Sequence, residues 1–293
     1  MEEKAKKTIL ITGATSGLGL AAMMGLAQES HLLIGVARSS EKIAATEKAI
    51  REQFPDAKVQ FIKADLSSQS EIRTLEIQVS ATLEAWGLDH LDVLVNNAGA
   101  VTSWYTPTED GIELQFAVNH LAPFLLTHLL LPYLQRAPQG RVLTVSSGSH
   151  RHTRIHWDDV MFSRHYGTLK AYKQSKLANV LFTLEFNRRF AASTAMRAYA
   201  VDPGLIKTQI GAKGTNGFVK WFWNNRSSHG NPPEVPAETI IYLACQPNLP
   251  DENQWYFKDC HPVEPSRYSQ RKEPARRLWA LSAHLCGMVD DSA

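Results

Sequence analysis

The sequence has few of the features that mark secreted or membrane-spanning proteins. It contains only 3 cysteines in 293 residues, Cys245, Cys260 and Cys286, and they form no Cys-x-x-Cys pair. An odd count at wide spacing argues against a disulfide framework and favours a reducing compartment, so we expect a cytoplasmic protein. No window holds about 18 consecutive uncharged apolar residues, so we expect no membrane span, although peripheral contact with a membrane stays open.

An excess of charge of one sign is also missing. Lys and Arg number 31 against 29 for Asp and Glu, a formal net charge of +2, which gives no general reason to expect nucleic-acid binding. We interpret the basic stretch "SRYSQRKEPARR" (266–277) as a solvated helix start. Apolar residues make up 44% of the chain, enough for a sizeable core. No linker, repeat or low-complexity segment divides it, so we expect a single domain over residues 1–293.

Apolar strand-like runs alternate with helix-like stretches as far as Gly204. We expect strands at 8–13, 31–37, 58–65, 91–99, 141–147 and 196–204. We expect helices at 17–29, 40–53, 69–86, 110–134, 169–190 and 236–246, and a C-terminal helical extension within 271–287. Continuous apolar strands that are each followed by a helix indicate a parallel sheet covered on both faces. The predicted fold class is therefore α/β, a doubly wound Rossmann domain with a mostly parallel sheet.

The first expected strand runs into the glycine-rich stretch "TGATSGLG" (12–19). Glycines permit a tight turn and close approach of the backbone to a ligand, and the following helix start can hold a pyrophosphate. The spacing G-x-x-x-G-x-G differs from the common G-x-G-x-x-G, and a purely structural turn is the alternative. In this strand-turn-helix context we predict a dinucleotide site formed by Gly13, Thr15, Ser16, Gly17, Leu18 and Gly19.

The end of the second expected strand bears on the choice of coenzyme. NAD-binding domains usually place an acid there to hold a ribose hydroxyl, but here Arg38 and Ser39 follow the strand and the first acid is Glu41. Because an arginine suits a 2′-phosphate, we predict NADP(H); a surface arginine at the strand end is the alternative. After the third strand, Asp65 and Leu66 are expected beside the adenine, and Asp65 is also a candidate N-cap for the next helix.

"AYKQSK" places Tyr172 and Lys176 four residues apart, on one face of a helix. A tyrosine titrates near pH ~10, but a nearby ammonium group lowers its pKa and makes it a usable proton donor at neutral pH. Alone, this spacing is more often an ordinary helix surface. Ser146 and Ser147, however, end the fifth strand at the sheet edge where such folds bind ligands. Asn119 stands in an apolar stretch, as a satisfied core amide or as part of the site.

Together these motifs resemble the short-chain dehydrogenase/reductase family over about residues 7 to 210. "TGATSGLG" resembles its cofactor loop and "NNAG" (96–99) its sheet-stabilising motif. The resemblance implies a catalytic tetrad of Asn119, Ser147, Tyr172 and Lys176, with the hydride supplied by the coenzyme and no metal. It also implies that "DPGLIKT" (202–208) closes over the nicotinamide. The further coenzyme contacts that we expect are Asn97, Ala98, Gly99, Tyr172, Lys176, Pro203, Gly204, Ile206 and Thr208.

The resemblance assigns a role to each tetrad residue. Tyr172 is expected to be the general acid/base, and Ser147 to orient the substrate oxygen. Lys176 is expected to hold the nicotinamide ribose and to tune the pKa of Tyr172. Asn119 is expected to position a water that relays protons to Lys176.

Three stretches, "RIHWDD" (154–159), "SKLANVLFTLEFNRRF" (175–190) and "LWALSAHLCG" (278–287), resemble the retinol dehydrogenase-like branch of that family. This branch acts on carbonyls and alcohols of bulky apolar molecules such as retinoids and sterols. We therefore expect an NADP(H)-dependent oxidoreductase with a lipophilic substrate. A C=C reductase and a non-catalytic NADP-binding sensor or scaffold are the alternatives.

Two segments outside these motifs need an interpretation. "HRHTRIHW" (150–157) carries three histidines, but no carboxylate or Cys pattern completes a metal set, so we expect a solvated loop at the mouth of the site; contact of one histidine with substrate is the alternative. We expect a substrate-covering cap over about 205–235, with an oligomer contact or a membrane patch as alternatives. The sequence does not decide between a monomer and a homodimer. The aromatic residues of the expected cap are Phe218, Trp221, Phe222 and Trp223.

Overall fold

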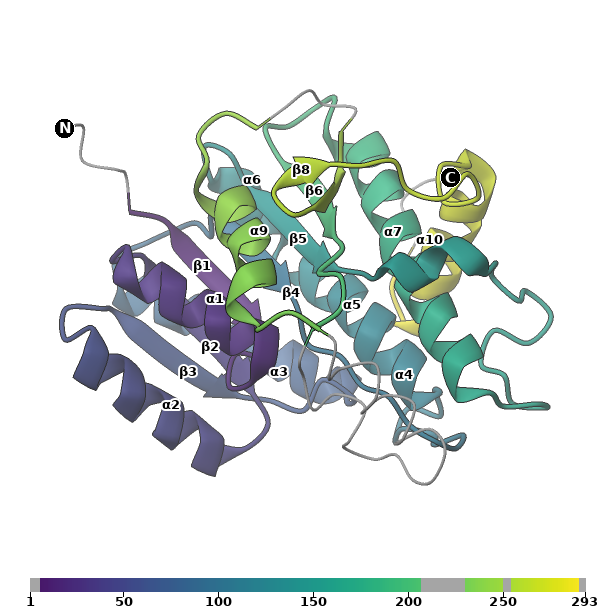
Figure 1. The fold of residues 1–293 in the computed structure, drawn as a ribbon, viewed down its shortest axis with the longest axis horizontal. Helices are drawn as coiled ribbons and strands as arrows, with labels where there is room; N and C mark the ends of the chain where they lie inside the picture. Colours follow the sequence, from purple (N-terminus) through teal and green to yellow (C-terminus); the bar gives the residue numbers. More distant parts are fainter. Residues whose placement is uncertain (1–5, 207–229, 250–253, 290–293) are drawn as a thin grey trace.

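The computed structural model describes residues 6–206, 230–249 and 254–289. In this part of the chain eight strands form one sheet in the order β3-β2-β1-β4-β5-β6-β7-β8 (Figure 1). Neighbouring strands from β3 to β7 pair in parallel, and β8 pairs antiparallel with β7. The bounds are β1 Thr8–Thr12, β2 Leu32–Ala37, β3 Val59–Lys63, β4 Val93–Asn96, β5 Arg141–Val145, β6 Arg197–Val201, β7 Tyr256–Lys258 and β8 His261–Pro262.

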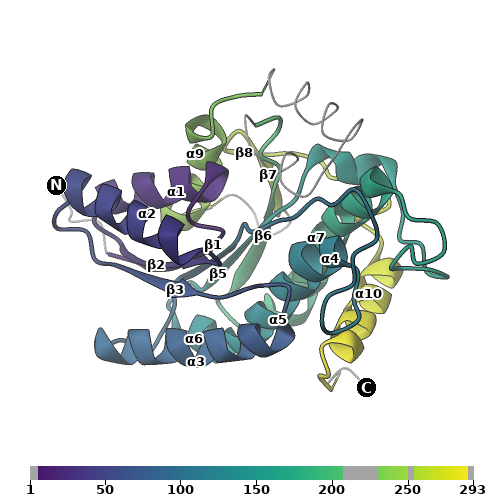
Figure 2. The same cartoon turned by 90° about the horizontal axis from the view of Figure 1, so that it is seen from below.

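Helices cover both faces of the sheet, as Figure 2 shows. One face carries α1 (Gly17–Gln28), α2 (Ser40–Gln53) and α9 (Glu234–Cys245). The other carries α3 (Gln69–Ala85), α5 (Ala122–Leu129), α7 (Thr168–Phe190) and α10 (Lys272–Leu285). None of the helices in the described ranges is both long enough and apolar enough to cross a membrane.

Alternation along β1 explains why two helical layers form. The side chain of Leu10 joins the core cluster under α3 and α7, whereas Ile9 and Ile11 join the cluster under α1 and α9. Successive side chains of a strand point to opposite faces, and all three are fully buried because both faces are covered. This arrangement confirms the predicted doubly wound α/β fold.

The position of the site follows from the strand order. β1 lies between β2 and β4, so the chain winds outward from β1 in both directions. In open α/β sheets a ligand binds at the carboxyl ends of the strands where the order reverses. The glycine loop after β1, the "NNAG" stretch at the end of β4 and Ser147 after β5 all lie at this edge.

The helix predicted over 110–134 is present from Leu114 onward, but it is not one regular α-helix. α4 (Leu114–Phe116) leads into a π-helical turn, η1 (Ala117–Leu121), and α5 follows before α6 (Leu131–Arg136). Pro123 and Pro132 stand in the first turns of α5 and α6. Because proline has no amide hydrogen, the regular i to i−4 bonding cannot run through either position. The predicted helix is therefore confirmed over most of its length, but its start before Leu114 and its regular α-helical geometry were wrong.

The strands β7 and β8 were also missed from the sequence. They have three and two residues, too few to show a periodic apolar pattern. β7 nevertheless extends the parallel sheet, with Ala200 paired to Tyr256 and Val201 to Phe257. The last part of the chain is thereby attached to the edge beyond β6, next to the segments that carry the site.

Candidate active site

The glycine loop is packed too tightly to accept side chains. Gly13 and Gly17 have φ of 68° and 54°, in the left-handed region that favours glycine. A Cβ atom on Gly19 would lie 2.3 Å from the carbonyl oxygen of Gly13 and 2.5 Å from Nδ2 of Asn97. The first turn of α1 has no acidic residue, and the Ser16 side chain makes no cap hydrogen bond. The amide groups at this helix start therefore suit a phosphate group.

The "NNAG" stretch braces this loop from β4. Nδ2 of Asn97 donates to the carbonyl oxygen of Thr12 at 2.7 Å. The backbone amides of Asn97 and Ala98 donate to Oγ1 of the same threonine at 2.9 and 3.0 Å. Asn96 is bonded to α5 instead, since its Nδ2 donates to Oγ1 of Thr127 at 3.1 Å. These bonds fix the separation between the ends of β1 and β4.

The ends of β2 and β3 carry the residues expected near the adenosine end of a coenzyme. Arg38 is exposed directly after β2. Oγ of Ser39 accepts a hydrogen bond from the backbone amide of Lys42 and so caps the start of α2. Asp65 does not cap α3, because Ser68 is the N-cap of that helix. Instead, Oδ1 of Asp65 accepts hydrogen bonds from the amide and the hydroxyl of Ser67 at 2.9 and 2.8 Å. The capping role considered for Asp65 is therefore wrong, and its carboxylate holds the turn before the helix.

Tyr172 and Lys176 lie one turn apart on α7, with Nζ of the lysine 5.8 Å from the tyrosine ring centroid. Lys176 is only 3% exposed, and its Nζ donates to the carbonyl oxygen of Val145 at 3.0 Å. Burial lowers the pKa of Lys176 to about 8, because desolvation penalises the ammonium form. At pH 7 the lysine therefore still carries its charge, fixed against the end of β5.

Asn119 lies in the π-helical turn and is 1% exposed. Its Oδ1 accepts from the amide of Ala100 at 2.7 Å, and its Nδ2 donates to the carbonyl oxygen of Ala100 and to Oγ of Ser175, both at 3.0 Å. Oγ of Ser175 in turn donates to the carbonyl oxygen of Tyr172 at 2.9 Å. Asn119 is thus a satisfied buried amide that also connects the loop after β4 to the tyrosine on α7.

Ser147, the fourth residue of the expected tetrad, lies just after the end of β5. It is half-buried, and its Oγ accepts a hydrogen bond from the amide of Ser149 at 3.3 Å, which leaves the hydroxyl hydrogen for another acceptor. Ser146, just before it, is buried, and its Oγ donates to the carbonyl oxygen of Lys176 at 2.8 Å. The end of β5 is therefore bonded both to the side chain and to the backbone of the lysine on α7.

Comparison with known proteins agrees with this arrangement. The sequence model of the family described as short chain dehydrogenase matches residues 7–217. The chain belongs to the short-chain dehydrogenase family. It is therefore an oxidoreductase acting on CH–OH groups, and the coenzyme of this family is NAD(H) or NADP(H).

Similar proteins cover nearly the whole chain. Human retinol dehydrogenase 11 is 34% identical over 285 residues, which is 97% of this chain and 87% of the relative. Human retinol dehydrogenase 13 is 36% identical over 291 residues, 96% of this chain and 85% of the relative. The crystal structure of an uncharacterized protein from Mycobacterium Paratuberculosis has a TM-score of 0.73 at 33% identity, covering 97% and 94% of the two chains. The predicted resemblance to retinol dehydrogenases is confirmed.

One histidine of this short-chain dehydrogenase departs from the expected solvated loop. Residues Gly148–His152 form a 3₁₀ helix, η2, in which His150 is fully buried, whereas His152 and His156 are exposed. The prediction of a solvated loop was therefore wrong for His150. Burial lowers the pKa of its imidazole. The ring is thus held in its neutral form beside the catalytic serine expected for the family.

His150 joins three distant segments. Its Nδ1 donates to the carbonyl oxygen of Ser147 at 2.8 Å, and its Nε2 accepts from the amide of Ser266 at 3.0 Å. The hydroxyl of Tyr256 lies 3.4 Å from Nδ1 and donates to Oδ2 of Asp202 at 2.9 Å. This network fixes the end of β5 against the end of β6 and the segment before α10. Sequence reasoning missed it, because His150 lies more than a hundred residues from both Tyr256 and Ser266 in the chain.

The segment after β6 is described only in part. Oδ1 of Asp202 accepts from the amide of Gly204 at 3.0 Å, and Gly204 has a φ of 66°, so the chain turns sharply here. Ile206 forms an isolated parallel bridge with Asn231. Thr208 and the aromatic residues of the predicted cap lie within 207–229, outside the described residues.

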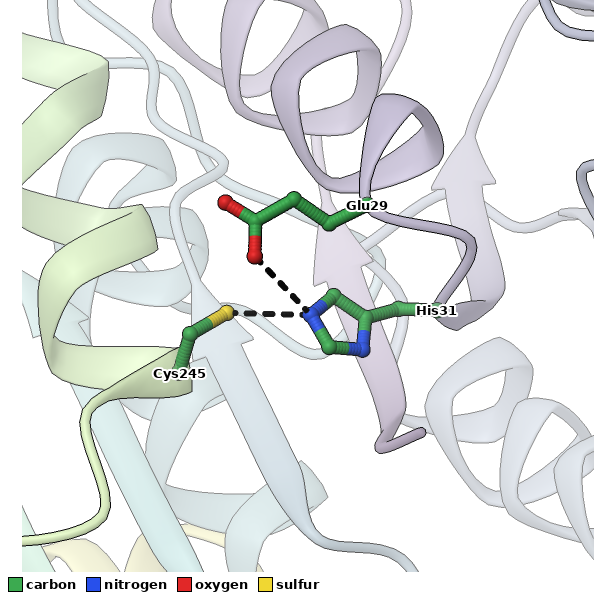
Figure 3. Close-up of side chains that lie close together, drawn as sticks. All are labelled: Glu29, His31 and Cys245. Atoms are coloured by element: carbon green, nitrogen blue, oxygen red, sulfur yellow. Dashed lines mark hydrogen bonds and ion pairs between the residues drawn. The ribbon is translucent and has the colours of Figure 1, made fainter. Parts of the chain in front are cut away.

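A second polar cluster lies at the opposite, amino-terminal edge of the sheet (Figure 3). Ligand-type atoms of Glu29, His31 and Cys245 lie within 4.8 Å of one another. However, Nδ1 of His31 accepts a hydrogen bond from the amide of Lys7 at 3.2 Å, which leaves the ring proton on Nε2, the nitrogen that faces the other two side chains. In a metal-binding histidine, the nitrogen that faces the metal carries no proton and the other ring nitrogen donates a hydrogen bond. The cluster therefore does not have the hydrogen bonding of a metal site.

Proposed function

We propose that this protein is a cytoplasmic NADP(H)-dependent oxidoreductase that interconverts a carbonyl and an alcohol on a bulky apolar substrate. The observation that carries the proposal is the pair of Tyr172 and buried Lys176, fixed beside the end of β5 at the same sheet edge as the glycine loop. The names of the retinol dehydrogenase relatives favour a lipophilic substrate.

In this mechanism the bound coenzyme supplies the hydride, and side chains of the protein donate or accept the proton. Tyr172 donates its phenolic proton to the substrate oxygen during reduction and accepts it back during oxidation. The ammonium of Lys176, held by the carbonyl of Val145, stabilises the phenolate that remains. Ser147 donates its hydroxyl hydrogen to the substrate oxygen and orients it. We assign to Asn119 the positioning of a water that relays protons to Lys176.

The preference for NADP(H) rests on Arg38, which is exposed directly after β2 with no acid before Glu41. The variant Arg38→Asp removes the cation that would pair with a 2′-phosphate and introduces repulsion. We expect the ratio of kcat/KM for NADPH over NADH to fall at least about tenfold, roughly the effect of one lost charge-assisted hydrogen bond. Arg51→Asp, which changes an exposed arginine near the end of α2, is the matched control. An unchanged ratio in Arg38→Asp would show that Arg38 does not select the coenzyme.

The substrate class is tested by following NADPH oxidation with retinal, a steroid ketone, a quinone and an aliphatic aldehyde. We expect turnover with at least one lipophilic carbonyl and the corresponding alcohol as product. Product analysis separates this activity from reduction of a C=C bond. Tight binding of NADPH without oxidation by any of these compounds would instead favour a non-catalytic sensor.

A further inference from the structure

Two basic segments that the sequence predicts to be solvated meet around one hollow in the structure. The hollow has a volume of about 1090 Å³ and is bordered by residues 151–156, the first two turns of α7 and residues 264–270. Glu264 is the one carboxylate among the described residues that line it. The basic lining consists of Arg151, Arg154, Lys170, Lys173 and Arg267, with His152 and His156 beside them.

This concentration of positive charge is local, because the whole chain is nearly balanced at 31 basic against 29 acidic residues. Within the described ranges, no carboxylate forms an ion pair with any of the five Lys and Arg side chains. Arg151 donates to the backbone carbonyl of Glu264 rather than to its carboxylate. The guanidinium of Arg154 stands 5.8 Å from the ring of Tyr268, and that of Arg271 stands 6.0 Å from the same ring. Like charges therefore converge here, and the one carboxylate in the described lining, Glu264, forms an ion pair with none of the five.

Such an arrangement weakens the folded state slightly, since like charges repel one another. Lys170 adds to this cost, because a cation in the first turn of a helix opposes the helix dipole. Departures from locally favourable electrostatics are typical of functional positions. The missing counter-charge is one that a ligand can supply.

We propose that this hollow binds a phosphate-bearing polyanion. Guanidinium groups match phosphate oxygens with paired donors, and lysines add point charges. A single carboxylate would leave most of the five cations uncompensated, whereas a multiply charged phosphate ligand would not. The same chemistry occurs in a soluble polyphosphate and in the headgroup of an anionic phospholipid. None of the described lining residues is one that we assign to catalysis or to the coenzyme.

The test uses the full chain saturated with NADPH, so that the coenzyme's own phosphate contacts are already occupied. Inositol hexakisphosphate is titrated by calorimetry, and vesicles of phosphatidylcholine with phosphatidylserine are tested by co-sedimentation, with pure phosphatidylcholine vesicles as background. We expect binding to at least one of these two probes, and we expect it to weaken as NaCl is raised, because salt screens exposed charges.

The decisive variant is Arg154→Glu with Arg267→Glu, which reverses two charges of the lining. We expect its affinity for the bound probe to fall at least about tenfold, since each basic residue near an anionic surface contributes appreciably. Lys48→Glu with Arg51→Glu makes the same charge change on exposed α2 and should bind as wild type does. If the first variant fails to show a cooperative melt, Lys170→Gln with Lys173→Gln replaces it.

The outcomes separate the sources of the phosphate. Binding of inositol hexakisphosphate without vesicle binding identifies a soluble ligand, and vesicle binding alone identifies a lipid headgroup. The proposal is wrong if the NADPH-saturated protein binds neither probe. It is equally wrong if reversing the charges of Arg154 and Arg267 leaves the affinity unchanged.

Discussion

Lys176 carries a positive charge into the interior of the protein, where its Nζ donates to the carbonyl of Val145 at 3.0 Å. Desolvation lowers its pKa from 10.5 to about 8, so keeping it charged at pH 7 costs on the order of 3 kcal/mol of folding free energy. The chemistry proposed for Tyr172 needs this ammonium. The lysine that we propose to support catalysis is therefore one that the folded state would hold more easily without its charge.

The variant Lys176→Met removes the charge and keeps an unbranched side chain. We expect it to lose turnover and to melt at pH 7 at the wild-type temperature or above it. The folded-state pKa lies below the unfolded one, so wild-type stability rises with pH from about 8 to about 10.5 and the advantage of the variant shrinks over this range. Thermal melts at pH 7 and pH 10 measure both effects, and a variant clearly less stable at pH 7 would contradict this account.

His150 and His152 stand two residues apart but differ in burial and bonding. His150→Ala leaves the amide of Ser266 without its partner and removes the imidazole hydrogen bond to the carbonyl of Ser147, which then keeps only the backbone amide of residue 150, so we expect a loss of about 2 kcal/mol of unfolding free energy. Because Ser147 loses its support, we also expect kcat to fall at least about tenfold, with the NADPH dissociation constant changed less than about threefold. His152→Ala, at an exposed position, should stay within about 0.5 kcal/mol. Equal effects in denaturant titrations and kinetics would argue against a special role for His150.

At the scale of elements, the start of α1 must approach the loop after β4 very closely. Gly19→Ala places a Cβ 2.3 Å from the carbonyl oxygen of Gly13, and we expect about 1–3 kcal/mol of destabilisation from overpacking. The NADPH dissociation constant should rise at least about tenfold, because the helix start is displaced. In Gly167→Ala the added Cβ approaches only the flexible side chain of Lys170, at 3.3 Å, and should change little. Unaltered NADPH binding by Gly19→Ala, measured by fluorescence titration, would contradict the assignment of this loop.

The elements that were predictable from the sequence are those with long, uniform patterns. The apolar runs at β1, β2, β4 and β5 indicated the parallel sheet, and the 14-residue α2 coincides with the helix expected at 40–53. The region 110–134 was correctly expected to be helical for most of its length, but the π-helical turn within it and the turn at Leu130 were missed because its apolar residues continue through both. The short strands β7 and β8 form by pairing to an existing sheet edge, so tertiary contacts rather than local pattern decide them.

On the scale of the whole molecule, the doubly wound sheet brings four parts of the chain to one edge: the glycine loop, the end of β4, Ser147 and the helix α7 with Tyr172. The positions of the glycine loop, the "NNAG" stretch and Ser147 were predictable, because each directly follows a recognisable strand. The bonds of His150 to Ser266 and Tyr256 span 116 and 106 residues, and no local pattern encodes such pairs. The basic hollow was hidden for the same reason, since its members come from three segments and the net charge of +2 does not show it.

The central claim is that the hydroxyl of Tyr172 transfers the proton, and the variant Tyr172→Phe tests it most directly. With a lipophilic carbonyl that the wild type reduces, we predict that kcat falls by about 10²–10⁴-fold, the range for a lost general acid, while NADPH still binds with a dissociation constant within about threefold of wild type. Tyr242→Phe, at a half-buried position on α9, is the control for loss of a tyrosine hydroxyl and should keep full activity. Turnover by Tyr172→Phe at the wild-type rate would contradict the account.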